Sequence, residues 1–195
     1  MVGAKENKMI KLKSLLKEFQ GKTLHVYDFD DTLVKTQTSV GLINKDGERS
    51  ELSSHEFATH KLKSGEKYDF SDFDKLIKKS KPIAANIAQI KRSLSNPVIK
   101  TTILTARRLA FPIAKHLKDS YGLNVYVVGV GSADPEVKAD WIEEQVVKRK
   151  YVNIKFVDDS IKNLNAVAAR LEKYPEVNLE LIDAKTGQSL TQLTT

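Results

Sequence analysis

The sequence contains no cysteine and only one tryptophan and two methionines in 195 residues. The absence of cysteine excludes disulfide frameworks, cysteine-ligated zinc, iron–sulfur clusters and thiol catalysis. No apolar run approaches the roughly 20 residues that a membrane-spanning helix requires. Residues 1–8 are polar and lack the apolar segment of a signal peptide. We therefore expect a cytoplasmic protein that has no membrane partner.

The composition is typical of one folded domain of ordinary size. Apolar residues make up 41% of the chain and charged residues 29%, which argues against a disordered protein. The 32 basic residues exceed the 25 acidic ones and give a net charge of +7. This excess fits either a solvated lysine-rich surface or affinity for a polyanion such as nucleic acid. No sequence motif of a known nucleic-acid-binding module favours the second interpretation.

The chain begins with a pattern typical of an amphipathic helix at residues 5–20. Leu12, Leu15, Leu16 and Phe19 recur at helical spacing, and lysines occupy the positions between them. We expect this helix to pack on its own domain, although basic amphipathic helices also bind membrane surfaces.

Strand-like and helix-like segments alternate along most of the remaining chain. The expected strands are residues 23–27, 100–104, 124–128, 153–157 and 177–182. The expected helices are residues 83–94, 108–119, 134–148 and 161–173. Such alternation predicts βαβ units and therefore a Rossmann-like α/β fold. We expect residues 1–195 to form a single domain, with a mostly parallel five-stranded sheet and helices on both faces.

Residues 34–97 are less regular and predict a flap or a small cap-like insertion. Residues 41–47 resemble a strand that enters a hairpin turn at Asp46-Gly47. Short helices are expected after Ser54 and from Ser71 to about residue 79, where serine is a favourable helix cap. Pro82 suits the first turn of the helix at residues 83–94.

Two acidic groups follow expected strands. In the first, Asp28-Phe29-Asp30-Asp31-Thr32, alternation predicts that the side chains of Asp28 and Asp30 point the same way. No cation is adjacent in the sequence, so the two carboxylates require a metal ion or a proton between them. The second group, Asp158-Asp159, is a suitable place for a cation that prefers oxygen ligands, such as Mg²⁺. In an open α/β sheet, ligand sites lie at the carboxyl ends of the strands.

Two further residues gain meaning from their positions beside these carboxylates. Thr105 ends an expected strand and precedes Ala106-Arg107-Arg108. Such a threonine serves as a helix cap or holds a phosphate with its hydroxyl and backbone. Lys138 lies in the first turns of an expected helix, where a lysine by itself usually faces solvent.

The order of these motifs resembles the haloacid dehalogenase (HAD) superfamily of phosphotransferases. The resemblance covers residues 22–183 and rests on YDFDDTLV, ILTAR, Lys138 and KFVDDS. Response-regulator receiver domains use similar residues, but their lysine follows the acidic residues instead of preceding a closing acidic pair. Dehalogenases of the superfamily lack the second aspartate, so Asp30 favours phosphoryl transfer.

The resemblance implies a role for each residue. Asp28 is the expected nucleophile, Asp30 the general acid and base, Thr105 a ligand of the phosphoryl oxygens, and Lys138 a neutralising cation. The expected Mg²⁺ ligands are Asp28, Asp30 through its carbonyl, Asp158 and Asp159, with Asp159 favoured as the direct ligand of the closing pair. The expected substrate contacts are Thr32, Thr105, Ala106 and Arg107.

The short insertion at residues 34–97 predicts a rather open site that admits large substrates. The layout and the basic charge are similar to those of polynucleotide 3′-phosphatase domains and of HAD-type proteins encoded by large tailed phages. We therefore expect a Mg²⁺-dependent phosphomonoesterase that forms an aspartyl-phosphate, with a nucleotide or a nucleic-acid end as the favoured substrate. A catalytically inactive HAD-like domain that binds nucleic acid or protein is the alternative. A phosphomutase requires a larger cap.

Overall fold

The computed structural model describes residues 21–52 and 54–190. The helix expected at residues 5–20 lies outside the described residues. Among the helices of the described part, none is both long enough and apolar enough to span a membrane.

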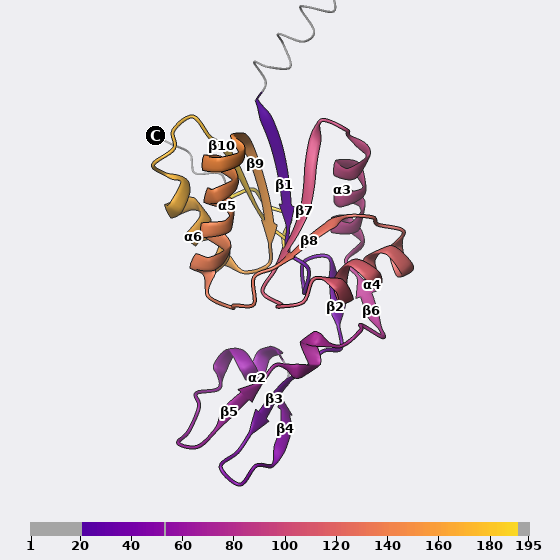
Figure 1. Cartoon of the computed structure of the whole chain (residues 1–195), viewed down its shortest axis with the longest axis vertical. Coiled ribbons are helices and arrows are strands. Elements are labelled where there is room, and N and C mark those ends of the chain that lie inside the picture. The colour runs from indigo at the N-terminus through magenta and orange to yellow at the C-terminus, as the bar shows by residue number, and fades with distance from the viewer. Residues whose placement is uncertain (1–20, 53, 191–195) are drawn as a thin grey trace, which may run out of the picture.

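A five-stranded parallel sheet forms the centre of the molecule (Figure 1). Its strands are β1 (Lys22–Tyr27), β7 (Ile99–Thr105), β8 (Tyr126–Gly129), β9 (Tyr151–Asp158) and β10 (Asn178–Asp183). They lie in the order β10-β9-β1-β7-β8, so that the first strand of the chain occupies the middle of the sheet. The structure thus confirms a mixed α/β fold with a Rossmann-like parallel sheet.

Helices cover both faces of this sheet. They are α3 (Ala84–Ser95), α4 (Phe111–Tyr121), α5 (Pro135–Arg149) and α6 (Ile161–Leu171). Helices α3 and α4 pack in one apolar cluster, and α5 and α6 pack in another on the opposite face (Figure 1). We call the central sheet and these four helices the main body.

The strand residues alternate between the two clusters. Leu24 and Val26 of β1 pack with α5 and α6, whereas Tyr27 packs with α3 and α4. A central strand buried on both faces needs apolar side chains pointing both ways.

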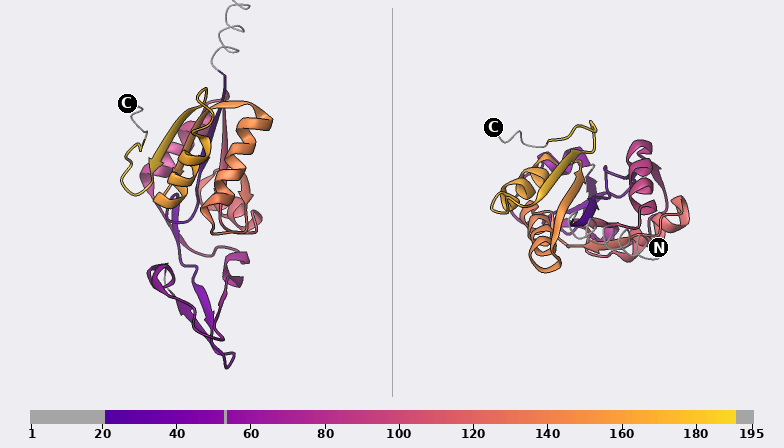
Figure 2. Two further views of the ribbon diagram at one scale, coloured as in Figure 1. Left: turned by 90° about the vertical axis from the view of Figure 1, so that its left-hand side faces the viewer. Right: turned by 90° about the horizontal axis from the view of Figure 1, so that it is seen from above.

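A second, smaller unit projects from the carboxyl ends of the strands (Figures 1 and 2). It contains the antiparallel strands β3 (Val40–Ile43), β4 (Arg49–Leu52) and β5 (Lys67–Asp69), the helix α2 (Ser54–Thr59) and one 3₁₀ turn, η1 (Ser71–Asp74). Two short antiparallel strands, β2 (Val34–Thr36) and β6 (Ser80–Pro82), join it to the main body. We call residues 37–79 the small lobe.

The expected Asp46-Gly47 hairpin is confirmed, because β3 and β4 pair antiparallel on either side of it. The helix expected from Ser71 to residue 79 is wrong, since the helical geometry stops at Asp74 and Lys75 is extended. The chain must return to the main body and pair with β2, and this pairing outweighs the local helical pattern. For the same reason Pro82 ends β6 instead of beginning a helix.

The helix expected from residue 108 begins instead at Phe111. Residues 106–110 form a loop, which is held by hydrogen bonds from the Val130 N–H to the Thr105 carbonyl and from the Gly131 N–H to the Arg107 carbonyl. A Cβ atom at Gly129 would lie only 2.5 Å from the Arg107 carbonyl oxygen. The loop can therefore approach the end of β8 only because residue 129 is glycine.

Candidate active site

The four predicted motifs meet at the carboxyl edge of the central sheet. Asp28 follows β1, Thr105 ends β7, Asp158 ends β9, and Lys138 lies in the first turns of α5. Helix α5 begins there because Pro135 occupies its first turn and the Asp134 carboxylate accepts a hydrogen bond from the Glu136 N–H. This helix direction places Lys138 next to the carboxyl ends of β1 and β9.

Lys138 links two buried aspartates that are distant in the sequence. Its Nζ lies 2.7 Å from Asp28 Oδ1 and 2.8 Å from Asp158 Oδ2. All three side chains are almost entirely buried. Burial by itself would lower the pKa of Lys138, but the two carboxylates raise it well above its usual range, so the ammonium stays charged.

The three residues Asp28, Asp158 and Asp159 form an acidic cluster. One carboxylate oxygen of each lies within 4.8 Å of the others. The pKa of Asp28 is raised to about 7, mainly by burial and in addition by the negative charge of Asp158, while the positive charge of Lys138 opposes the rise. Burial also raises the pKa of Asp159. Three carboxylates thus face two ammonium groups, the buried one of Lys138 and the exposed one of Lys185, which leaves an excess of potential negative charge.

The two members of the Asp158-Asp159 pair differ in their hydrogen bonds. The Asp158 carboxylate accepts hydrogen bonds from Lys138, the Ser160 N–H and the Asn163 side-chain amide. The Asp159 carboxylate contacts the exposed Lys185 at 2.9 Å and accepts a hydrogen bond from the Thr32 hydroxyl at 3.5 Å. Asp159 therefore has more free acceptor capacity than Asp158, and its role as the direct metal ligand of the pair stays a prediction.

The donor chemistry of the acidic cluster fits a divalent cation that prefers oxygen ligands. Carboxylate oxygens are the protein ligands of Mg²⁺ and Ca²⁺, and the described cluster contains no histidine. The Asp30 carboxylate is not a member of the cluster. Any contribution of Asp30 to a metal site would therefore come from its backbone carbonyl.

Asp30 pairs instead with Arg107. Arg107 Nε and Nη2 donate to the two carboxylate oxygens of Asp30, each at 2.7 Å. Nη2 also donates to the hydroxyls of Thr36 and Thr38, and Nη1 donates to the Phe73 carbonyl. The guanidinium, which is almost fully buried, thus connects Asp30 to both chain segments that enter and leave the small lobe.

This geometry changes the expectation for two residues. Asp28 and Asp30 were expected to share one cation between parallel side chains, but each carboxylate has its own cation from a distant segment. Arg107 was expected to contact the substrate phosphate, but its donors are directed at Asp30 and the small-lobe connections.

The other expected substrate contacts lie close to the cluster but differ in accessibility. Thr32 is fully buried, and its hydroxyl accepts a hydrogen bond from the Asp159 N–H, so it ties the first acidic loop to the last. The Thr105 hydroxyl is also buried and accepts a hydrogen bond from the Arg107 N–H. Ala106 is exposed and lines a cleft beside the site.

Three residues support the site without any signal in the sequence motifs. The buried Asn86 donates to the carbonyls of Thr32 and Ala184 and so joins three segments of the chain. Lys185 contacts both the carboxylate and the backbone carbonyl of Asp159. The third, Gly129, allows the close approach of the loop at residues 106–110. Their effect depends on contacts across the fold, which sequence spacing does not reveal.

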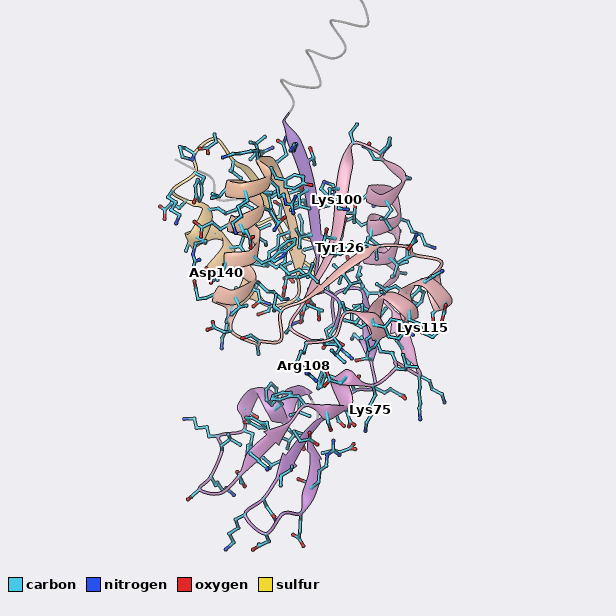
Figure 3. The ribbon with its side chains drawn as sticks, viewed as in Figure 1. Lys75, Lys100, Arg108, Lys115, Tyr126 and Asp140 are labelled. Carbon is cyan, nitrogen blue, oxygen red and sulfur yellow. The ribbon has the colours of Figure 1, made fainter. Side chains whose placement is uncertain are left out.

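A cleft of about 550 Å³ opens between the small lobe and the main body. The small lobe contributes the rings of Phe57, Phe70 and Phe73 to its walls, and the main body contributes Asp30, Ala106 and Arg107. Figure 3 shows Arg108 at this boundary, where its guanidinium pairs with the Asp74 carboxylate of the small lobe. Asp30 is therefore the acidic group of the site that faces the cleft.

No family model matches the sequence, and searches of curated proteins and of solved structures return no match. The geometry of the site is therefore the basis on which a function can be proposed.

Proposed function

We propose that this protein is a Mg²⁺-dependent phosphomonoesterase of the HAD type, which acts through an aspartyl-phosphate on Asp28. The observation that carries the proposal is the contact of Lys138 with both Asp28 and Asp158, next to Asp159. It unites residues from three separate motifs in the order and at the sheet edge that the resemblance implies.

In the proposed first step, a carboxylate oxygen of Asp28 attacks the phosphorus atom of the ester. The bond between phosphorus and the leaving oxygen breaks, and the leaving oxygen takes a proton from Asp30. Lys138 holds the attacking carboxylate in place and lies close enough to balance the charge that develops on the phosphoryl oxygens. Ala106, beside Thr105, is exposed, and its backbone N–H is the proposed donor to those oxygens.

In the second step, Asp30 removes a proton from a water molecule, and the water oxygen attacks phosphorus. The bond between phosphorus and Asp28 breaks, so that the carboxylate is regenerated and inorganic phosphate is released. Both oxygens of Asp30 accept hydrogen bonds from Arg107 in the structure. Asp30 must therefore loosen part of this bidentate contact to donate a proton, whereas the same contact holds its carboxylate in a fixed orientation.

Asp28, Asp158 and Asp159 would hold the Mg²⁺, together with the Asp30 carbonyl. When bound, the cation would supply charge neutralisation that lets the anionic Asp28 approach an anionic phosphate. In the described part of the chain, the three carboxylates of the cluster face only the ammonium groups of Lys138 and Lys185, and this excess of potential negative charge supports the need for a further cation.

The covalent intermediate gives the most specific test of this proposal. An activated aryl phosphate needs no acid for its leaving group, so Asp30→Asn is expected to form the aspartyl-phosphate and to hydrolyse it slowly. Mass spectrometry of rapidly quenched protein should find one phosphoryl group on the peptide that contains Asp28. The Asp28→Asn protein should carry none. Turnover by wild type without an adduct in Asp30→Asn would contradict the covalent mechanism.

A further inference from the structure

The cleft between the small lobe and the main body has an aromatic wall. Phe70 lies between Phe57 and Phe73, with ring centroids 5.7 Å and 6.1 Å away. Phe70 is 47% exposed although it packs against these two rings, and its own ring lines the cleft. A phenylalanine held by aromatic neighbours yet open to a cleft offers a flat apolar surface to a bound molecule.

The charged groups of the cleft neutralise one another. Arg107 pairs with Asp30 at one position, and Arg108 pairs with Asp74 at another. The Ser71 hydroxyl donates to Asp69, and the Ser132 hydroxyl accepts from the Asp134 N–H. The lining therefore suits a neutral, flat group with a few polar edges. A polyol or a second anion would find few groups to replace its hydration.

We infer that this cleft binds a nucleobase in the leaving group of the phosphate ester. The inference rests on the proposed function, since it places the phosphate at Asp28 and the leaving oxygen at Asp30. Asp30 lies on the cleft wall, so a leaving group that receives its proton extends from there toward Phe70. A volume of about 550 Å³ is within the range of small-molecule sites and accommodates a nucleoside.

The shared chemistry is a planar base attached through a sugar to the scissile phosphate. This chemistry occurs both in a free mononucleotide and at the phosphorylated end of a nucleic-acid strand. Stacking of a base on an aromatic ring is tolerant of sequence, because every base has a π face. We therefore expect little discrimination among the four bases.

The direct test compares two esters of the same sugar, one with the base and one with a hydroxyl group in its place. Phosphate release is measured for deoxyadenosine 5′-monophosphate and for 2-deoxyribose 5-phosphate, with wild type, Phe70→Ala and Phe70→Leu. Phe70→Leu retains apolar bulk and removes the ring, which separates stacking from general packing. Phe111→Ala is the matched control, because Phe111 is 68% exposed on α4 and lies outside the cleft.

The inference predicts that wild type prefers the nucleotide and that both Phe70 variants reduce its kcat/KM by about 10-fold. Hydrolysis of 2-deoxyribose 5-phosphate should be unchanged in these variants, and Phe111→Ala should behave as wild type with both esters. Equal rates for the two esters, unaffected by either Phe70 variant, would overturn the cleft assignment and leave the phosphatase proposal intact.

Two further experiments distinguish the source of the base and test base binding when no phosphate is released. Oligonucleotides with a 3′- or a 5′-terminal phosphate, compared with mononucleotides, distinguish a strand end from a free nucleotide. Equilibrium dialysis with deoxyadenosine measures binding to the cleft independently of phosphate release, because this nucleoside carries no phosphate. If no ester released phosphate, the proposed function would fail, and weaker nucleoside binding by Phe70→Ala would still support the cleft. Nucleoside binding that is undetectable, or equal in wild type and variant, would count against the cleft in that case.

Discussion

Arg107 donates hydrogen bonds to both carboxylate oxygens of Asp30 and also to the Phe73 carbonyl of the small lobe. One buried guanidinium therefore couples the expected acid–base residue to the segment that forms the cleft wall. The Arg107 guanidinium also lies 4.8 Å from the centre of the Phe73 ring, which adds a cation–π contact to the same connection.

Replacing Arg107 by Gln should therefore affect both chemistry and the small lobe. We expect kcat to fall by about 100-fold, because Asp30 loses the group that orients it. Hydrogen–deuterium exchange at residues 36–40 and 71–75 should become faster. Arg92→Gln, on the exposed surface of α3, is the control and should change neither. Loss of activity with unchanged exchange would contradict the coupling.

The buried Lys138 should be essential for stability as well as for turnover. Lys138→Met leaves Asp28 and Asp158 buried without their cation, which is expected to destabilise the fold by roughly 3–5 kcal/mol. Added Mg²⁺ should restore part of this loss, because it supplies positive charge to the same carboxylates. Denaturant unfolding with and without Mg²⁺ measures both effects. Lys148→Met, an exposed lysine on the same helix, should have little effect.

Asp28→Asn should have the opposite effect on stability in the absence of metal. The substitution keeps the shape of the side chain and removes one charge from three carboxylates that lie within 4.8 Å. Thermal unfolding in a chelator should occur about 2–4 °C higher for each kcal/mol of repulsion removed. Mg²⁺ should raise the melting temperature of wild type more than that of the variant. A variant less stable than wild type in chelator would show that the Lys138 contact outweighs the repulsion.

Stability should also decline in mildly acidic solution because of His116. Burial lowers the pKa of His116, and the positive charge of Arg107 lowers it further, although a backbone hydrogen bond with Ile77 and the charge of Asp119 oppose this. The unfolded chain therefore binds a proton more readily than the folded protein does. The stabilisation is complete above the unfolded value near 6.5 and is lost as the pH falls below it, toward the lower folded pKa.

Melting temperatures between pH 7.5 and pH 5 measure this effect, and His116→Gln should reduce the slope. The pKa of His25 is lowered in the same way, first by burial and then by Lys155, so part of the slope should persist. Lys115→Gln on the same helix leaves both histidines in place and should leave the slope unchanged. An equal slope in wild type and His116→Gln would refute the assignment.

Much of the main body could be predicted from local patterns. Strand-like and helix-like segments alternate along the chain, and glycine or proline lies at several strand ends. The small lobe is less predictable from local patterns. Its short strands and the turn at Ser71 depend on the path by which the chain returns to pair with β2. At Lys75 the backbone is extended although the local pattern indicates a helix.

In the site, too, some residues are predictable from local sequence, whereas their partners depend on contacts between distant segments. The carboxylates of Asp28 and Asp158 were recognisable from their positions after strands. Their neutralising cation was not recognisable by spacing alone, because 110 positions separate Lys138 from Asp28. The partnership of Arg107 with Asp30 spans 77 positions and depends on the path of the loop that Gly129 permits. Such contacts follow from topology rather than from motif spacing.

The central claim is tested most directly by measuring phosphate release from an aryl phosphate, with Mg²⁺ and with a chelator. Wild type should release phosphate only with Mg²⁺, and Asp28→Asn should be slower by about 1,000-fold or more. Asp46→Asn, in the exposed hairpin turn, should match wild type. Release that persists in the chelator or in Asp28→Asn would contradict the account, as would a lack of release from wild type under every condition.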